Sequence, residues 1–383
     1  MRSSVAALRD QVDLCPGALT VHEAADGGLA RIRLPGGAVS SAQLRTLATA
    51  AAELGGGRLE LTSRGNVQIR ALPVGAEIEL GQRLAAVGLL PSATHERVRN
   101  IVASPLAGID APDAYPPGLV AELDRELCSR PGLAALPGRF LFAIDDGRGD
   151  VARLGADVAL VAHPAAGRAS IGSLDLPLGS AVQVMLAMAE AFLAERGVQR
   201  SQAWRIGELA GGLPAVTARA LPALSGAGVV PGGSDLPPAP PEPAGVIAQP
   251  QGLFALAVLA PLGRLSAAQA NLLAEFAGPG GLRITPWRSI VVPDLVDSGA
   301  AAEAASAAGL GVDAASPWYR VSACTGRPGC AKALADVQAD AAAEAGRWPG
   351  RQVHWSGCAR GCGRPHGTEV DVVATAGGYA INE

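Results

Sequence analysis

The chain has 383 residues, with 31 basic and 35 acidic side chains and a formal net charge of -4. This length predicts more than one domain and excludes a small scaffold that is stapled by disulfides. The near balance of charge gives no overall attraction to nucleic acid, and no apolar run reaches the length of a bilayer span, so we expect neither a nucleic-acid nor a membrane partner. The N-terminal residues lack the apolar segment of a secretory signal, which predicts a cytoplasmic protein.

A strand–helix–strand pattern occurs twice. The first copy begins near Ala30 and has a helix headed by Ser40, and the second begins near Phe254 and has a helix headed by Ser266. Serine is a preferred N-cap residue, and the flanking apolar stretches are typical of half-buried strands. Two long copies, rather than several short ones, predict a pseudo-twofold protein and not a solenoid.

The repeats and the local composition divide the chain into five expected parts. These are a first half-repeat over residues 1–78, a first α/β module over 79–230, a proline-rich linker over 231–245, a second half-repeat over 246–310 and a cysteine-bearing module over 311–383. Successive prolines favour polyproline II, so the linker is predicted to be extended. The apolar stretch from Ala181 to Leu193 predicts a buried amphipathic helix in the first module.

Four of the six cysteines form two pairs, Cys324-x5-Cys330 and Cys358-x3-Cys362. An iron–sulfur cluster with four thiolate ligands tolerates the wider gap better than structural zinc, whose pairs are usually about two to four residues apart. Disulfides are disfavoured in a reducing cytoplasm, and buried thiols without a ligand need not cluster in glycine-flanked pairs. We therefore prefer iron–sulfur ligation, with zinc, disulfides and unliganded thiols as alternatives.

The segment that follows Cys330 has the pattern of a helix that begins directly after this cysteine. Its N-terminus, together with Lys332 and Arg327, would stabilise a negatively charged cluster beside it. The two remaining cysteines, Cys15 and Cys128, are isolated and are interpreted as packed or free thiols.

The cysteine pairs occur together with three further motifs. These are the repeat, the turn Leu61-Thr-Ser-Arg-Gly-Asn-Val-Gln68, and Arg99-Asn100 followed by Pro105-Leu-Ala-Gly-Ile-Asp110. In this combination the chain resembles, over nearly its whole length, the sulfite/nitrite reductase superfamily, and within it the precorrin-3B synthases of aerobic cobalamin biosynthesis. The resemblance implies an α+β, pseudo-twofold fold. Two ferredoxin-like half-repeats would form a central domain between two α/β modules, and only the module over 311–383 would bind a 4Fe-4S cluster.

The resemblance also implies site residues. It assigns the cluster to the four paired cysteines, Cys324, Cys330, Cys358 and Cys362. Substrate carboxylates would be held at the motif positions Arg31, Arg33, Arg64, Arg99 and Arg139, because guanidinium forks match carboxylate geometry. Gln68 and Asn100 would add neutral hydrogen bonds to the substrate. In the second copy, Arg288 is expected to mirror Arg64. No catalytic residue is assigned.

One departure from the superfamily pattern favours the synthases. The reductases place two basic residues, one apart, beside the substrate anion, whereas the corresponding positions here are Arg139 and Leu141. Reduction of an anion needs a dense positive pocket, so this loss weighs against a reductase. The implied reaction is hydroxylation of precorrin-3A by dioxygen with closure of a γ-lactone. The alternative is a sirohaem-dependent sulfite or nitrite reductase. A rival of another class is a non-catalytic cluster or zinc protein, such as a tetrapyrrole carrier or an assembly subunit.

The implied reaction needs a non-haem iron in addition to the cluster. His354 and His366 lie near the cysteine motif and are its candidate ligands. No glycine fingerprint for NAD or FAD follows a predicted strand, so the electrons are expected from an external donor.

Overall fold

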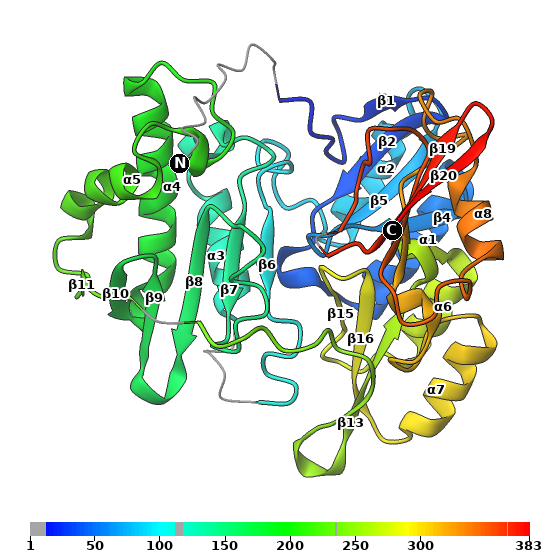
Figure 1. Cartoon of the computed structure of the whole chain (residues 1–383). Helices are drawn as coiled ribbons and strands as arrows, with labels where there is room; N and C mark the ends of the chain where they lie inside the picture. The colour runs from blue at the N-terminus through cyan, green and yellow to red at the C-terminus, as the bar shows by residue number, and fades with distance from the viewer. Residues whose placement is uncertain (1–12, 112–117, 234–235, 366) are drawn as a thin grey trace. The chain divides into compact units, whose positions relative to one another are not determined.

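A computed structural model describes residues 13–111, 118–233, 236–365 and 367–383. The described chain forms two compact units (Figure 1). The first unit comprises residues 13–17, 32–38 and 88–242, and the second comprises 18–31, 39–87 and 243–383. Each unit is assembled from segments that lie far apart in the sequence, and each is described by itself.

The first unit contains a six-stranded mixed sheet in the order β11-β10-β9-β8-β7-β6. Its strands are β6 (Ile101–Ala103), β7 (Phe142–Asp145), β8 (Val158–His163), β9 (Arg168–Ile171), β10 (Leu174–Pro177) and β11 (Val230–Pro231). The strands β6, β7 and β8 are parallel, and the other neighbours are antiparallel. All four residues of β7 are buried, as expected for a parallel strand that is covered on both faces.

The helices of the first unit are α3 (Leu119–Cys128), α4 (Ala181–Val198) and α5 (Gly212–Ala220). Both α3 and α4 contact the sheet, and α5 packs on α4 (Figure 1). The prediction of a buried helix over Ala181–Leu193 is confirmed, but α4 buries residues around most of its circumference rather than along one stripe. Among the described residues, one helical stretch, Leu178–Val198, is long and apolar enough to cross a membrane. However, 61% of its most apolar 18-residue window is buried inside the protein, as in a core helix.

The second unit contains two five-stranded sheets, in the orders β1-β2-β5-β4-β14 and β12-β13-β16-β15-β3. The first sheet consists of β1 (His22–Ala24), β2 (Gly27–Ile32), β4 (Arg58–Leu61), β5 (Val67–Leu72) and β14 (Arg264–Ser266). The second consists of β3 (Ala38–Val39), β12 (Gly245–Ala248), β13 (Phe254–Leu259), β15 (Leu282–Ile284) and β16 (Ser289–Leu295). Each copy gives one short strand to the sheet of the other, because β14 pairs with β4 and β3 lies beside β15. This exchange joins the two copies into the pseudo-twofold α+β arrangement that the sequence predicts.

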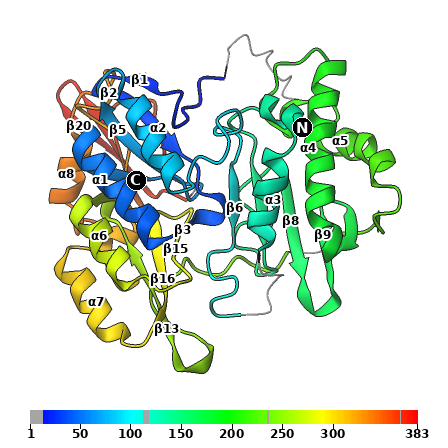
Figure 2. The same cartoon turned by 180° about the vertical axis from the view of Figure 1, so that it is seen from behind.

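The helices of the two copies are α1 (Ser41–Leu54), α2 (Ala76–Ala86), α6 (Ala267–Phe276) and α7 (Ser298–Ala307). Figure 2 shows them grouped on one face of the two sheets, and α1 contacts α6. The predicted N-caps, Ser40 and Ser266, are confirmed. Each serine side chain accepts a hydrogen bond from the N–H of the glutamine three residues later, and that glutamine side chain accepts from the serine N–H.

The C-terminal part of the second unit adds a four-stranded sheet in the order β17-β18-β19-β20. Its elements are β17 (Val321–Ala323), α8 (Val337–Ala343), β18 (Val353–Ser356), β19 (Val370–Thr375) and β20 (Gly378–Asn382). The first three strands are parallel and β20 is antiparallel. The carboxyl ends of neighbouring parallel strands meet at one edge of a sheet, so the residues that follow β17 and β18 lie next to each other.

The described part of the proline-rich segment, residues 236–243, forms no regular secondary structure. Its first residue contacts the first unit, because Arg153 Nη2 donates a hydrogen bond to the carbonyl oxygen of Leu236 at 2.9 Å. The domain boundaries expected from the sequence stay a prediction.

Candidate functional site

Two loops that follow parallel strands carry the paired cysteines. Cys324 directly follows β17, and Cys358 lies two residues after the end of β18. Backbone hydrogen bonds connect the loops. The N–H of Cys324 donates to Trp355 O at 2.9 Å, and the N–H of Leu334 donates to Gly357 O at 2.8 Å. The sheet therefore brings together two cysteine pairs that are separate in the sequence.

The four thiols are free and accessible to different degrees. Cys324, Cys330 and Cys358 are half-buried, and Cys362 is exposed. The backbone N–H of Gly357 donates to Cys324 Sγ at 3.1 Å. Backbone donors of this kind orient metal-bound thiolates and tune the potential of an iron–sulfur cluster.

The four sulfurs, all of them in the described ranges, do not form the close group that a single tetrahedral zinc ion needs. Bonds of about 2.3 Å to a single tetrahedral zinc ion would place neighbouring sulfurs roughly 3.8 Å apart. A metal site needs at least three Asp, Glu, His or Cys side chains with their ligand atoms close together. Across the described ranges, only three aspartates of the first unit have such atoms within 4.8 Å of one another. No three of the four cysteine sulfurs are that close. A set of four thiolates fits a four-iron cluster by its chemistry, because each thiolate binds a different iron.

The helix predicted directly after Cys330 is not formed. The helix α8 begins only at Val337, and the residues between form turns in which Lys332 is exposed. The N–H of Arg327 donates to Ala335 O at 2.9 Å. The backbone of this segment therefore forms hydrogen bonds across the loop instead of within a helix. The prediction of a helix N-terminus beside the cluster is therefore wrong. Arg327 does belong to the loop that carries Cys324 and Cys330.

His354 on β18 is buried, and both ring nitrogens are used within the fold. Nδ1 lies 2.8 Å from Ser322 Oγ, and Nε2 lies 3.2 Å from the carbonyl oxygen of Cys362. Burial lowers the pKa of His354 to about 4, which keeps the ring neutral. The side chain thus fixes the Cys362 loop to the sheet and presents neither nitrogen to an iron. The other candidate iron ligand, His366, lies outside the described residues.

The first sheet of the second unit presents one polar face. Residues directly opposite each other in an antiparallel pair share a face, and Glu60 is opposite Gln68 on one side and Arg264 on the other. Arg31 on β2 reaches this face, because its Nη2 donates to Gln68 Oε1 at 3.0 Å. We refer to Arg31, Gln68, Glu60 and Arg264 as the polar row. It brings together two of the predicted substrate residues, Arg31 and Gln68.

Glu60 is the titratable group of the polar row. Its desolvation raises its pKa, while Arg264 and Arg70 act in the opposite direction. Glu60 Oε1 lies 3.4 Å from Arg264 Nε. Both side chains line a cavity of about 200 Å³, whose wall also includes Thr325 and Gly329 of the first cysteine loop. The polar face of the sheet therefore meets a cysteine loop at this cavity.

Arg70 is a candidate site residue that the sequence did not single out. It lies two residues after Gln68 on β5, so strand alternation places it on the same polar face. Its guanidinium donates to the carbonyl oxygen of Gly329 at 2.8 Å. The alternation along Val67–Leu72 is the signal that could have found it.

Arg64 lies in the turn between β4 and β5, where its N–H donates to Thr62 Oγ1 at 3.4 Å. The second copy has an equivalent turn, in which the N–H of Trp287 donates to Thr285 Oγ1 at 3.2 Å. The matching bonds pair Arg64 with Trp287. Arg288 occupies the next position, with a φ of 64°, so it is not the positional equivalent of Arg64. A part for Arg288 in binding the substrate stays a prediction.

Two other predicted substrate residues meet at one loop of the first unit. Arg33 is buried, its Nε donates to Arg97 O at 3.1 Å, and its Nη2 donates to Gly138 O at 3.4 Å. The adjacent Arg139 is exposed, and its guanidinium carbon lies 5.6 Å from the ring centroid of Trp204. The structure therefore describes the predicted substrate residues as two groups, one in each unit.

Arg99 and Asn100, also in the first unit, are buried. Arg99 forms a bidentate ion pair with Asp124, with two N–O distances of 2.7 Å, and its Nη1 donates to Leu89 O at 3.1 Å. Asn100 Nδ2 donates to Phe140 O at 3.1 Å. These bonds support the fold of the unit, and a contact of either residue with substrate stays a prediction.

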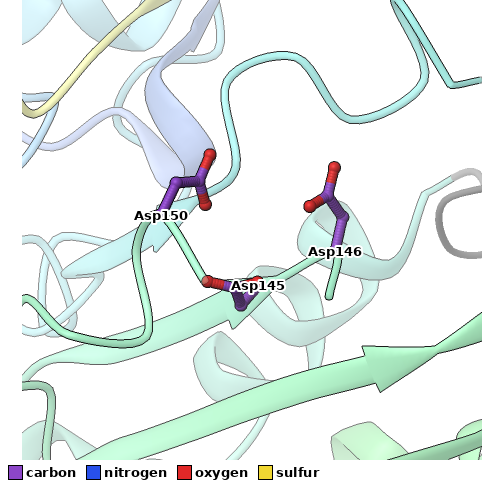
Figure 3. A group of neighbouring side chains, drawn as sticks. All are labelled: Asp145, Asp146 and Asp150. Carbon is purple, nitrogen blue, oxygen red and sulfur yellow. The ribbon is translucent and has the colours of Figure 1, made fainter. Parts of the chain in front are cut away.

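Three buried aspartates that the sequence did not single out lie at the end of β7 and in the following loop (Figure 3). Asp145 accepts four hydrogen bonds from backbone N–H groups of its own loop, at 2.8 to 3.0 Å. Asp146 forms an ion pair with Arg148 at 2.6 Å, and Asp150 accepts a hydrogen bond from Ser104 Oγ at 2.6 Å. These donors show that the three aspartates organise their own loop. We do not assign the expected non-haem iron to them.

Comparisons with known proteins agree with this architecture. Residues 22–87 and 247–303 match the model of the nitrite/sulfite reductase ferredoxin-like half domain. A precorrin-3B synthase from a Sinorhizobium species is 28% identical over 405 aligned residues, which cover 96% of this chain and 82% of that protein. A sulfite reductase (ferredoxin) from Mycobacterium tuberculosis is 29% identical over 80% of this chain and 60% of that protein. The solved structure of Mycobacterium tuberculosis NirA has a TM-score of 0.75 at 23% identity, covering 92% of this chain and 73% of that one.

The chain thus carries two nitrite/sulfite reductase ferredoxin-like half domains on the fold of a sulfite/nitrite reductase. Its relatives are oxidoreductases. The chain is similar to a precorrin-3B synthase over nearly its whole length, and the resemblance drawn from the sequence motifs is confirmed.

Proposed function

We propose that the protein catalyses the precorrin-3B synthase reaction, in which dioxygen hydroxylates precorrin-3A and a γ-lactone closes. The observation that carries this proposal is the similarity to a precorrin-3B synthase, which extends over 96% of this chain and 82% of that protein. The two linked cysteine loops support an iron–sulfur enzyme.

The surroundings of Leu141 favour the synthase over a reductase. Leu141 is 2% exposed, and its N–H donates to Asp157 Oδ2 at 2.9 Å. The resemblance places a basic residue of the reductases at this position, whereas here an apolar side chain is packed into the unit. Of the two basic residues that the reductases have here, this chain keeps only Arg139. A single guanidinium neutralises a small anion less well than two cations.

The paired cysteines Cys324, Cys330, Cys358 and Cys362 would hold a 4Fe-4S cluster that supplies single electrons, and a non-haem iron without assigned ligands would activate dioxygen. One oxygen atom of dioxygen enters the substrate and the other leaves as water, which consumes an electron pair and two protons. We infer that an external donor supplies the electrons and that the reaction takes place in the cytoplasm.

The protein side chains would bind and orient the tetrapyrrole. Arg31 and Gln68 in the polar row, and Arg64 in the turn between β4 and β5, offer donors for carboxylates on the second unit. Arg33, Arg99, Asn100 and Arg139 are the candidates on the first unit. Charge-assisted bonds of this kind hold a substrate in one orientation, which converts binding energy into rate.

The reaction is tested by isotope labelling. The protein is loaded with iron and sulfide, reduced, and mixed with precorrin-3A under argon before oxygen-18 gas is admitted. We expect one labelled oxygen atom in the product and no product without oxygen. Formation of the same product under argon, or a product without label, would contradict the proposal.

Cluster ligation is tested separately by metal analysis. The wild-type protein is expected to hold about four iron and about four sulfide ions per chain. Replacing any of the four paired cysteines by serine should lower this content, while Cys128→Ser should not. Cys128 lies at the end of α3, and burial raises the pKa of its thiol, as is typical of an unreactive cysteine.

A sirohaem-dependent sulfite or nitrite reductase is the second candidate function, and the half-domain match together with the NirA-like fold favours it. Sirohaem would then be bound as a cofactor where the synthase binds its substrate. Sulfite or nitrite turnover with an artificial donor by the purified protein would support this candidate against the synthase.

A further inference from the structure

Arg70 joins three parts of the second unit. Its side chain is only 10% exposed. Nε and Nη2 donate to the two carboxylate oxygens of Asp26 at 3.0 and 2.9 Å, and Nη2 also donates to the carbonyl oxygen of Gly329 at 2.8 Å. Asp26 lies in the turn between β1 and β2, and Gly329 directly precedes Cys330. One guanidinium therefore connects the first sheet to the loop that carries Cys324 and Cys330.

The loop is packed closely against this guanidinium. A Cβ atom on Gly329 would lie 2.6 Å from Thr325 Cγ2, 2.9 Å from Arg70 Nη2 and 3.1 Å from Asp26 Oδ2. These distances are shorter than ordinary van der Waals contacts. Only glycine fits there without moving Arg70 or the loop.

Two backbone bonds of this loop stay within the cysteine module. The N–H of Cys330 donates to Gly326 O at 2.8 Å, and the N–H of Arg327 donates to Ala335 O at 2.9 Å. Arg70 differs because it comes from β5, the strand that also carries Gln68 of the polar row. Arg70 therefore connects the cysteine loop to the strand that carries a proposed substrate residue.

We propose that Arg70, oriented by Asp26, is a positioning residue for the metal centre. It holds the Gly329 carbonyl, and with it the Cys330 thiol, in the arrangement that binds the cluster, and it fixes the cluster relative to the polar row. This inference rests on the proposed ligation of a cluster by the four cysteines.

The role requires the geometry of arginine and not only its charge. A guanidinium is a planar fork that serves a carboxylate bidentately and still has a donor for a carbonyl, whereas an ammonium is a point charge on a flexible stem. Arg70→Lys should therefore retain the charge but lose the simultaneous bonds to the Asp26 carboxylate and the Gly329 carbonyl.

The test compares variants of the full chain after anaerobic reconstitution with ferrous iron and sulfide. We refer to Arg70, Asp26 and Gly329 as the clamp. The clamp variants are Arg70→Lys, Asp26→Asn, Gly329→Ala and the double variant Arg70→Met with Asp26→Leu. The double variant removes both members of the ion pair, which avoids leaving an unpaired buried charge and preserves folding. Matched controls are Arg83→Lys, whose exposed ion pairs with Glu53 and Glu79 lie elsewhere in the unit, and Gly346→Ala, where a Cβ would meet nothing within 4 Å.

The readout is the lifetime of the cluster absorbance in the presence of an iron chelator, together with the unfolding temperature of the metal-free protein. We expect every clamp variant to lose its cluster about tenfold faster than wild type or more, as for other residues that support metal ligands. The double variant should do so while its metal-free form unfolds at the temperature of the controls. A double variant that keeps its cluster as long as wild type would overturn the inference. A wild-type protein that takes up no cluster would instead contradict the proposed ligation, and the clamp would then have nothing to position.

Discussion

The backbone N–H of Gly357 donates a hydrogen bond to the sulfur of Cys324 at 3.1 Å. The two residues belong to different cysteine loops, so this bond connects the two pairs directly. It exists because β17 and β18 are parallel neighbours and end at the same edge of their sheet. A backbone donor thus links the Cys324 thiol to the residue that directly precedes Cys358, which is 34 positions from Cys324 in the sequence.

Gly357→Ala should weaken cluster binding. A Cβ atom at this position would lie 2.7 Å from Ala333 Cβ, so the two cysteine loops would have to separate. We expect the affinity for the cluster to fall about tenfold, measured by chelator competition. Gly377→Ala, where a Cβ meets nothing within 4 Å, serves as the control, and equal affinities of the two variants would speak against the arrangement.

Arg31→Met should weaken the binding of the tetrapyrrole. Arg31 donates to Gln68 on the polar row, and losing a charge-assisted bond to a substrate carboxylate costs about tenfold in binding. The expected result is a KM about tenfold higher with a kcat that changes little, since the bond forms in the ground state as well. Arg45→Met, on the exposed side of α1, should leave both constants unchanged. If KM does not rise in the Arg31 variant, this residue is not part of the substrate site.

Ser40→Ala and Ser266→Ala should each destabilise the second unit by about 1 kcal/mol, because each removes the side-chain half of a capping box. Urea unfolding of the two variants is the measurement. Thr46→Ala is the control, because its hydroxyl bonds to Ala42 O inside α1 and contributes little to helix stability. Unequal losses in the two serine variants would show that the two copies are not equivalent at their helix starts.

The sequence predicts best what local signals determine. Ser40 and Ser266 are recognisable as caps because the glutamine that completes each box is three residues away. The pseudo-twofold fold and the grouping of the cysteines also follow from repeated patterns and short spacings. The helix predicted after Cys330 failed because a bond from Leu334 N–H to Gly357 O competes with a local helical bond.

Arg70 illustrates why part of the site could not be predicted. Its partners Asp26 and Gly329 are 44 and 259 residues away in the sequence, so no local pattern contains the three. Arg99, in contrast, lies in a recognisable motif, yet its motif position does not reveal that Asp124 and Leu89 O engage its guanidinium inside the fold.

Asp150 should make the stability of the first unit depend on pH. Burial raises its pKa from 3.8 to about 6, Ser104 acts in the opposite direction, Asp145 and Asp146 raise it further, and Arg148 lowers it. Between about pH 4 and pH 6 the unfolded chain releases this proton while the folded chain keeps it, so the free energy of unfolding falls as the pH rises through this window.

Asp150→Asn should remove this dependence, since the amide still accepts from Ser104 and cannot ionise. We expect the variant to be more stable than wild type at pH 7, by on the order of 1 to 3 kcal/mol, and equally stable near pH 4. Calorimetric unfolding at the two pH values provides the comparison. A gain in stability of the same size at both pH values would assign the effect to something other than ionisation.

As proposed above, the protein binds an iron–sulfur cluster without a resident sirohaem and oxidises a tetrapyrrole with dioxygen. One cuvette suffices for the test. The visible spectrum of the anaerobically purified and reconstituted protein is recorded, precorrin-3A is added with a reductant, and air is then admitted. We expect a broad cluster absorbance without sirohaem bands, and conversion of the substrate only after oxygen enters. Intense sirohaem bands in the purified protein, with no conversion of precorrin-3A after oxygen is admitted, would contradict it.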